Sequence, residues 1–409
     1  MKPYISVVMP VYNGQRFLRE AVESIQNQTF SDFELLILNN ASTDNSRQIL
    51  YEYEKLDNRI RILEQPIRDL TPSLQRGFLE ACGRYIARMD SDDIALPDRL
   101  EKQVSFLDNH PEIAVLGGQV DAIDDQGNFI RKLVFPLDHD EISEALEKYC
   151  SIVHPTVMLR PEAYKAVGGY RVEPFSAEDY DLWLRMSEKF QLANLQDVLL
   201  KYRIHGEQVS STRREKQIVT ILGIRAAARL RKAGYSDPIS GIDAIDENRI
   251  RQWGVTETEY IRFHVEDDLF YSSLLFDSGH HDAAREVISD SLARSPLQYL
   301  EPEKVARLCK EFIHLHTLED LPFENLALLL KMSIKKPRLM KEVIRCFPRW
   351  LLLLGGALQH QENGFRALQQ GNRASAYKFF RRAVLSNPLC LLNRGVVTTL
   401  IRYAGKVKD

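Results

Sequence analysis

Short hydrophobic runs alternate with amphipathic segments along the first 135 residues of the chain. Runs at 4–12, 33–39, 60–63 and 85–89 have the length and apolar content of buried strands. Between them, the pattern predicts three helices: one from Arg16 onward, one after the capping residues 42–44 that runs to about Leu56, and one over 72–82. Strands and helices in this order predict an α/β fold with a mostly parallel sheet and helices on both faces.

The pattern changes twice further along. A helix is expected over 97–109, with strands at 113–123 and 129–135, and a mixed segment continues to about 205. From 213 onward the periodicity is helical almost throughout. Two windows in that part, 279–288 and 371–380, resemble the second half of a tetratricopeptide unit, and an irregular helical bundle is the alternative. We therefore divide the chain into an α/β domain (1–212), a helical region (213–325) and a basic helical region (326–409).

Composition fits a soluble globular protein, with 44% hydrophobic and 27% charged residues. The five cysteines are scattered and form no CxxC pair, which disfavours a disulfide framework or a zinc site. The N-terminus shows no signal-peptide pattern, and the apolar run at 350–358 is too short to span a bilayer. These features predict a cytoplasmic location.

Charge is divided unevenly along the chain. Residues 326–409 hold 16 Lys and Arg against three acids, whereas the whole chain has 54 against 57. The segment 331–352 mixes cations with apolar and aromatic residues, which suits peripheral binding to an anionic membrane surface. Docking on the chain's own acidic N-terminal half is the alternative. No nucleic-acid partner is expected, because no recognition motif accompanies the charge.

The strand at 85–89 ends in three carboxylates, Asp90, Asp92 and Asp93. Like charges at 4 Å repel by about 1 kcal/mol in water and by roughly 4 kcal/mol at a semi-buried site. A cation would remove that cost, and carboxylates are ligands for Mg²⁺ or Mn²⁺, which bridge to substrate phosphates. The alternative is a strand-to-helix turn in which Asp93 or Asp98 caps the next helix.

Polar residues also follow other strand ends, where open sheets of this kind bind ligands. The first strand closes in a turn that presents Tyr12 and Asn13, and the second ends in Asn39 and Asn40. Further along, 176–185 brings Glu178, Asp179 and Asp181 to the first turn of a predicted helix, whose dipole favours their charged forms.

With these motifs in this order, residues 3–210 resemble the family 2 glycosyltransferases, which have a GT-A fold. The matching stretches are 83–103, His154–Met158, Gly168–Tyr170, Glu178–Trp183 and Tyr202–His205. The resemblance implies transfer of a sugar from a nucleotide-sugar to an acceptor hydroxyl with inversion, in cell-surface polysaccharide or glycolipid assembly. The acceptor would be a saccharide or a lipid-linked saccharide.

The resemblance also implies roles for individual residues. The nucleotide would be bound by Pro10, Val11, Tyr12, Asn13, Asn40 and Asp90, with Tyr12 stacking on the base. Mn²⁺ or Mg²⁺ would be held by Asp92, Asp90 and His205. Asp179 matches the general base, and the motif rather than helix geometry selects it over its acidic neighbours. Asn39-Asn40 departs from the usual acidic pair, so uridine is preferred while thymidine and guanosine stay open.

Some residues have plainer interpretations. His154 is expected to shape an acceptor-side loop, and most of Arg68, Arg76, Arg84 and Arg88 are expected to pair with acids at the surface. Two other functions stay open. A nucleotidyltransferase would also use clustered aspartates, but 11–14 lacks a Gly-rich phosphate loop. A non-catalytic scaffold would use its helical half to bind partners.

Overall fold

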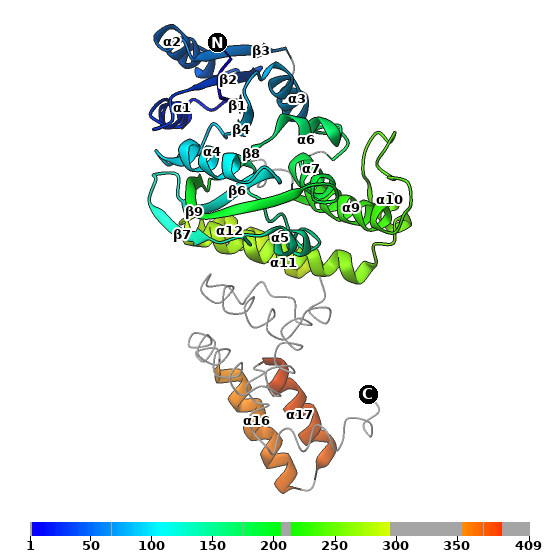
Figure 1. Ribbon diagram of the computed structural model, residues 1–409. Coiled ribbons are helices and arrows are strands. Elements are labelled where there is room, and N and C mark those ends of the chain that lie inside the picture. Colours follow the sequence, from blue (N-terminus) through cyan, green and yellow to red (C-terminus); the bar gives the residue numbers. More distant parts are fainter. Residues whose placement is uncertain are drawn as a thin grey trace. The chain divides into compact units, whose positions relative to one another are not determined.

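The computed structural model describes residues 2–66, 68–174, 176–205, 214–294, 354–370 and 372–386 (Figure 1). The chain divides into two compact units. One contains Met1–Tyr260 with Leu274–His280, and the other contains Ile261–Ser273 with His281–Asp409. The second unit includes most of the undescribed residues, so the predicted division at 212 and 325 stays a prediction.

A nine-stranded mixed sheet forms the centre of the first unit. Its order is β3-β2-β1-β4-β8-β6-β9-β5, and β7 pairs with β6 outside this path. The strands are β1 (Ile5–Val11), β2 (Phe33–Asn40), β3 (Ile60–Gln65), β4 (Tyr85–Arg88), β5 (Ile94–Ala95), β6 (Ile113–Ile123), β7 (Phe129–Leu133), β8 (Met158–Leu159) and β9 (Gln191–Arg203). β1 to β4 are parallel, whereas β8 joins β4 to β6 by antiparallel pairing.

Helices cover this sheet and continue beyond it. They are α1 (Leu18–Gln26), α2 (Ser46–Leu56), α3 (Leu70–Glu80), α4 (Arg99–Asn109), α5 (His139–Leu146), the 3₁₀ helix η1 (His154–Thr156), α6 (Pro161–Ala166), α7 (Glu178–Ser187), α9 (Arg214–Lys232) and α10 (Glu247–Gln252). A further helix, α11 (Glu257–Asp277), begins and ends in this unit, while its residues Ile261–Ser273 belong to the other. α1 buries the face predicted from its periodicity, Leu18, Ala21, Val22 and Ile25.

Alternating residues of the parallel strands serve the two faces of the sheet. Val7 and Ile37 belong to the core shared with α1, α2 and α4. Val8 and Leu38 face the other side, where Gly77 of α3 approaches so closely that a Cβ would lie 2.6 Å from Val8. These contacts confirm the predicted α/β layers of a GT-A fold. The carboxyl ends of β1, β2 and β4 consequently lie side by side at one edge.

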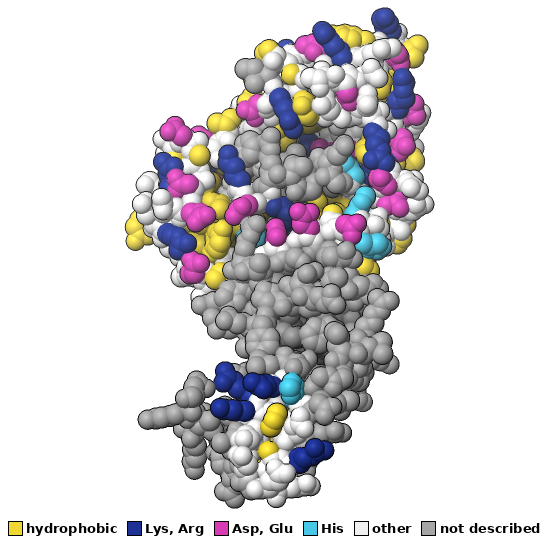
Figure 2. Space-filling view, turned by 180° about the vertical axis from the view of Figure 1, so that it is seen from behind, with side chains coloured by type: hydrophobic (Ala, Val, Ile, Leu, Met, Phe, Trp, Pro, Cys, Tyr) yellow, Lys and Arg dark blue, Asp and Glu magenta, His cyan; other side chains and the backbone are white. Residues whose placement is uncertain are grey.

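The second unit is helical where it is described. It contains α12 (His281–Arg294) and the hairpin of α16 (Leu354–Gln369) and α17 (Arg373–Ser386). Within the two windows with the tetratricopeptide-like pattern, helices begin at His281 and Arg373, and the matched alanines Ala284 and Ala376 are fully buried. Basic side chains are exposed on the hairpin (Figure 2), among them Arg366, Lys378 and Arg382. The segment 331–352 lies outside the described residues, and the tetratricopeptide arrangement stays a prediction.

No helix among the described residues is both long and apolar enough to cross a membrane. Of the apolar run at 350–358, residues 354–358 lie in the first turns of a described helix, and residues 350–353 lie outside the described part of the chain.

Gly83 allows β4 to run close to β1. A Cβ at this position would lie 2.5 Å from the backbone nitrogen of Ser6. Because backbone atoms cannot move aside as a side chain can, we expect Gly83→Ala to lower the free energy of unfolding by about 1–3 kcal/mol. Urea denaturation measures this change. Gly127→Asn is the comparison for backbone strain without close contact, since no atom lies within 4 Å of a Cβ there and its φ of 86° favours glycine. Equal midpoints for Gly83→Ala and the wild type would contradict the packing argument.

Candidate active site

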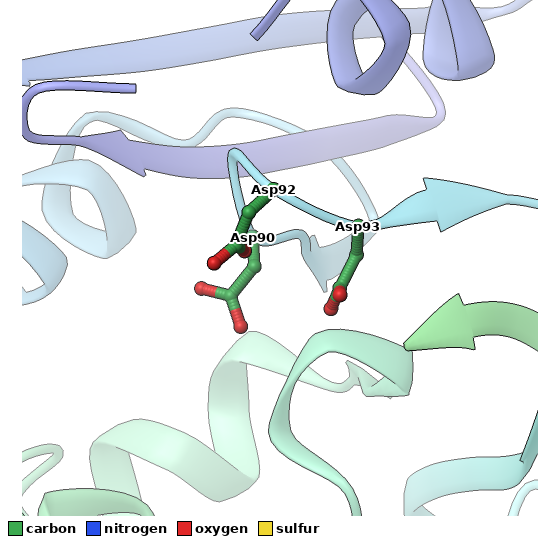
Figure 3. A group of neighbouring side chains, drawn as sticks. All are labelled: Asp90, Asp92 and Asp93. Atoms are coloured by element: carbon green, nitrogen blue, oxygen red, sulfur yellow. The ribbon is translucent and has the colours of Figure 1, made fainter. Parts of the chain in front are cut away.

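Three carboxylates converge at the turn after β4, which we call the acidic turn (Asp90–Asp93). One oxygen from each of Asp90, Asp92 and Asp93 lies within 4.8 Å of the others. Figure 3 shows the three side chains projecting to the same side of the turn. Among the described residues, Oδ2 of the buried Asp93 has no hydrogen-bond partner. Burial, followed by the charges of Asp92 and Asp90, raises the pKa of Asp93 well above its usual range.

Such a group of oxygen ligands fits Mg²⁺ or Mn²⁺, because a cation would offset both the repulsion and the buried, unpaired oxygen. Asp93 was expected either to belong to this cluster or to cap a helix. The structure favours the cluster. Oδ1 of Asp93 accepts a hydrogen bond from the backbone of Arg203 at 2.8 Å, and α4 begins after Asp98 without a side-chain cap.

Arg203 fixes the acidic turn to β9. Its buried guanidinium donates from Nε to the carbonyl oxygen of Asp92 at 2.8 Å and pairs with Glu20 on α1 at 2.7 Å. Two residues further along, Nε2 of His205 lies 3.0 Å from Oδ2 of Asp92, and the imidazole ring packs on Phe17. The structure therefore brings three of the predicted site residues together: Asp90, Asp92 and His205.

Arg88 lies just before the acidic turn. From the sequence, it was expected to pair with acids at the surface. Its side chain is only 4% exposed and forms an ion pair with Asp90. That expectation is correct for Arg84, which pairs with Asp108 and is 55% exposed. Arg88 differs because it is the last residue of β4 in the middle of the sheet, and its charge balances part of the acidic cluster. The neighbouring acids were a signal for this pairing, but its burial depends on strand order.

The predicted nucleotide-binding residues lie at the ends of β1 and β2. Pro10 and Val11 are buried at the end of β1. The guanidinium of Arg68 stacks on the ring of Tyr12, with 3.8 Å between the guanidinium carbon and the ring centre. One face of the Tyr12 ring is thus already in a cation–π contact with Arg68.

The asparagines at these strand ends hold the two loops together. Oδ1 of Asn13 accepts from the backbone of Thr43 at 2.8 Å, and the Asn13 backbone donates to Oγ of Ser42. Asn13 adopts a left-handed φ of 49°, which asparagine tolerates. Oδ1 of Asn40 accepts from the backbone of Asp69 at 3.0 Å, and Asn39 donates to Glu64. Asn40 is therefore fixed beside the chain that carries Arg68.

The first turn of α7 holds three acids in different environments. Asp181 is 1% exposed and pairs with both Arg171 and Arg185, so its oxygens are already used. Asp179 is 25% exposed, its Oδ1 accepts from the backbone of Tyr180, and burial raises its pKa. Burial, followed by the charge of Asp179, raises the pKa of Glu178 to about 8. Of the three, Asp179 combines access with a carboxyl group that favours taking up a proton.

Comparison with known proteins identifies the family to which the chain belongs. Residues 6–168 match the model of "Glycosyl transferase family 2". The chain is 35% identical to the O-antigen biosynthesis glycosyltransferase WbnJ of Escherichia coli over 213 residues, 51% of this chain and 82% of that protein. It is 34% identical to the putative glycosyltransferase EpsE of Bacillus subtilis, covering 58% and 86%. It is 30% identical to the amylovoran biosynthesis glycosyltransferase AmsE of Erwinia amylovora, covering 51% and 79%.

Among solved structures, S. aureus TarS 1–349 in complex with UDP-GlcNAc aligns with a TM-score of 0.48 and 18% identity, covering 82% of this chain and 92% of that one. The mannosyltransferase PcManGT from Pyrobaculum calidifontis, in complex with GDP-Man and Mn²⁺, aligns with a TM-score of 0.46 and 14% identity, covering 85% and 86%. On the sequence matches, the chain belongs to glycosyl transferase family 2.

Asp181 and Asp179 should respond differently to the same substitution. Asp181→Asn leaves the guanidiniums of Arg171 and Arg185 around a neutral amide, so we expect a loss of about 3–5 kcal/mol in unfolding free energy. Asp179→Asn should cost much less, because the protein already disfavours the charge at that position. Urea denaturation at pH 7 compares the two variants. Equal losses would contradict the different environments described for the two carboxylates.

The raised pKa of Glu178 should make the stability of the protein depend on pH. Its folded pKa of about 8 exceeds the unfolded value of 4.5, so the folded state holds a proton that the unfolded state releases between these pH values. Stability from this group therefore falls as pH rises from about 4.5 to about 8. Glu178→Gln removes the effect, and its melting temperature should exceed that of the wild type at pH 8 but approach it near pH 5. A constant difference across this range would show that the glutamate is not held protonated.

Proposed function

We propose that this protein transfers a sugar from a nucleotide-sugar, UDP-linked in our preferred assignment, to an acceptor hydroxyl by a single inverting displacement assisted by Mn²⁺ or Mg²⁺. The observation that carries the proposal is the convergence of Asp90, Asp92 and Asp93 within 4.8 Å at the end of a central strand. Family membership supports glycosyl transfer as the reaction.

In this proposal the divalent ion is held by Asp92, Asp90 and His205, with Asp93 as a further oxygen ligand. Bound there, the ion supplies Lewis acidity to the departing diphosphate. Burial raises the pKa of Asp90, and the ion pair with Arg88 opposes that shift. Arg203 holds the turn in place. The protein thus keeps several carboxylates close together without allowing them to move apart.

The nucleotide lies across the ends of β1 and β2. Pro10 and Val11 form the floor, Tyr12 stacks on the base, and Asn40 bonds to its edge. Asn13 acts by fixing the two loops to each other, as its bonds to Ser42 and Thr43 support. Because the guanidinium of Arg68 stacks on the ring of Tyr12, an incoming base either displaces this guanidinium or is enclosed between it and the ring.

Asp179 acts as the general base that removes the proton of the acceptor hydroxyl. Inversion requires one displacement and one base, whereas a retaining enzyme of this kind would need a second carboxylate as nucleophile. Its raised pKa suits a group that must gain a proton during the reaction. The buried pairing of Asp181 supports the choice of Asp179, which the sequence motif alone had made.

The acceptor is proposed to be a saccharide or lipid-linked saccharide of a cell-surface polysaccharide or glycolipid. The relatives WbnJ and AmsE, named for O-antigen and amylovoran biosynthesis, support this class. We further propose that the protein is cytoplasmic and that its basic C-terminal region binds an anionic membrane surface, as the 16 basic residues against three acids in 326–409 suggest. Family membership disfavours the nucleotidyltransferase and the scaffold.

Two substitutions separate donor binding from chemistry. Asp92→Ala should abolish the Mn²⁺-dependent part of UDP binding, because it removes the central ligand of the proposed ion. Asp179→Asn should bind UDP and Mn²⁺ nearly as the wild type does while slowing transfer by a factor of about 10²–10⁴. Calorimetric titration measures binding, and nucleotide release from a panel of nucleotide-sugars measures turnover. Asp98→Asn, an acid outside the cluster, is the control for general effects of charge. Equal and mild effects of Asp92→Ala and Asp179→Asn would defeat both roles.

A further inference from the structure

A histidine and a tyrosine lie in line behind the proposed base. Nδ1 of His154 lies 3.9 Å from Oδ2 of Asp179, and Nε2 on the other side of the ring is 2.7 Å from the hydroxyl oxygen of Tyr170. His154 is 8% exposed and Tyr170 is 2% exposed, so water does not compete freely for these contacts. The three groups come from different segments: α7 carries Asp179, η1 carries His154, and the loop after α6 carries Tyr170.

Tyr170 is held firmly from several sides. Gly168 and Gly169 have left-handed φ values of 81° and 69°, and a Cβ on Gly169 would lie 2.6 Å from the ring of Tyr164. The guanidinium of Arg185 bonds to the carbonyl oxygen of Gly169 at 2.7 Å, which ties this loop to α7. Gln75 donates to the carbonyl oxygen of Tyr170 at 2.8 Å. The loop therefore fixes the tyrosine hydroxyl relative to the helix that carries the base.

His154 is held as a neutral ring. The edge of Trp183 packs against it, with ring centres 5.9 Å apart. Burial, followed by the charge of Arg88, lowers the pKa of His154 well below 6.5. A neutral imidazole carries a hydrogen on one nitrogen only, and the anionic carboxylate of Asp179 favours Nδ1–H. Tyr170 can then donate its hydroxyl hydrogen to Nε2.

We propose that His154 and Tyr170 are positioning residues for Asp179: Tyr170 donates to Nε2 of His154, whose Nδ1–H points at Oδ2 of the carboxylate. This inference rests on the proposed role of Asp179 as the base. The backbone of Tyr180 already donates to Oδ1, so the carboxylate is oriented through both oxygens. The 3.9 Å separation is longer than a hydrogen bond, as is common in ligand-free catalytic sites, and we expect it to shorten in the donor complex.

Other groups also set the charge around Asp179, and the test must separate them from His154. Arg88 lowers the pKa of Asp179 and Asp90 raises it. Among the described residues, the other titratable groups that interact with Asp179 are Glu178 and Tyr180 on α7, Cys150 before η1, and Tyr170. None of these is altered in the His154 variants, so a change in those variants reports on His154.

The tautomer of His154 can be measured without donor, metal or acceptor. In the full-length protein labelled with ¹⁵N-histidine, two-bond NMR correlations distinguish Nδ1–H from Nε2–H, and the signal lost in His154→Gln identifies the residue. We expect a neutral Nδ1–H ring in the wild type between pH 6 and 8, and a shift toward Nε2–H in Asp179→Asn, whose amide no longer attracts the hydrogen as an anion does. An Nε2–H ring in the wild type, or a protonated one, would overturn the proposal.

Two substitutions separate positioning from packing in kinetics. The side-chain nitrogen of asparagine mimics Nδ1 of histidine, whereas that of glutamine mimics Nε2. We expect His154→Gln to move the acidic limb of the pH profile for hydrolysis of the nucleotide-sugar up by about one pH unit. The reason is that the charged carboxylate of Asp179 loses a hydrogen-bond donor. His154→Asn should retain most of the wild-type profile despite its smaller volume. If the activities of the two variants instead follow side-chain volume, and their pH profiles are not shifted, His154 is only a packing residue.

Tyr170→Phe retains the ring and removes the hydroxyl, so it tests the same chain of contacts should a His154 variant fail to fold. We expect it to shift the limb in the same direction by a smaller amount, and an unshifted limb contradicts the role of Tyr170. His110→Gln, in which the ring stacked on Phe106 at the end of α4 is replaced, is the control histidine. The proposed function fails on its own if Asp179→Asn still transfers sugar. If Asp179→Asn is inactive while the His154 and Tyr170 variants keep the wild-type profile, only this inference fails.

Discussion

The charge balance at the end of β4 is the constraint on which the rest of the site depends. Asp90, Asp92 and Asp93 occupy one turn in the middle of the sheet, where their repulsion is not fully screened by water. The protein offsets part of it with the buried Arg88 and with backbone donors such as the amide of Arg203. One buried carboxylate oxygen stays without a hydrogen-bond partner among the described residues. A site that remains short of positive charge after these contacts is suited to a divalent cation.

The same principle separates the acids of α7. Asp181 is paired with two arginines, whereas Asp179 forms no ion pair with a lysine or arginine among the described residues and is partly exposed. The two residues lie two positions apart on one helix, yet their neighbours give them different electrostatic environments. Although β4 and α7 are far apart in sequence, the fold brings the proposed metal ligands and the proposed base to the same region of the first unit. Arg88 and Asp90 are close enough to Asp179 to shift its pKa.

The sequence predicted most of this first unit because its signals are local. The apolar face of α1 and the boundaries of β1 and β2 follow from hydrophobic periodicity, which the structure confirms. The convergence of Asp90 and Asp92 with His205 was implied by family resemblance, and no periodicity could have shown it. The burial of Arg88 depends on the order of the strands. The arrangement of His154 between Asp179 and Tyr170 depends on the conformation of loops. Glycines in the sequence indicate where such loops turn, but they do not determine the loop conformation.

The most direct test of the account is a crystal structure of the protein with UDP and Mn²⁺, measured at the manganese absorption edge. The account predicts one anomalous peak between the acidic turn and the diphosphate, with Asp92 in contact with the ion and Asp179 turned toward the open side of the site. A bound diphosphate with no anomalous peak, and with Asp90 and Asp92 turned away from it, would contradict the central claim.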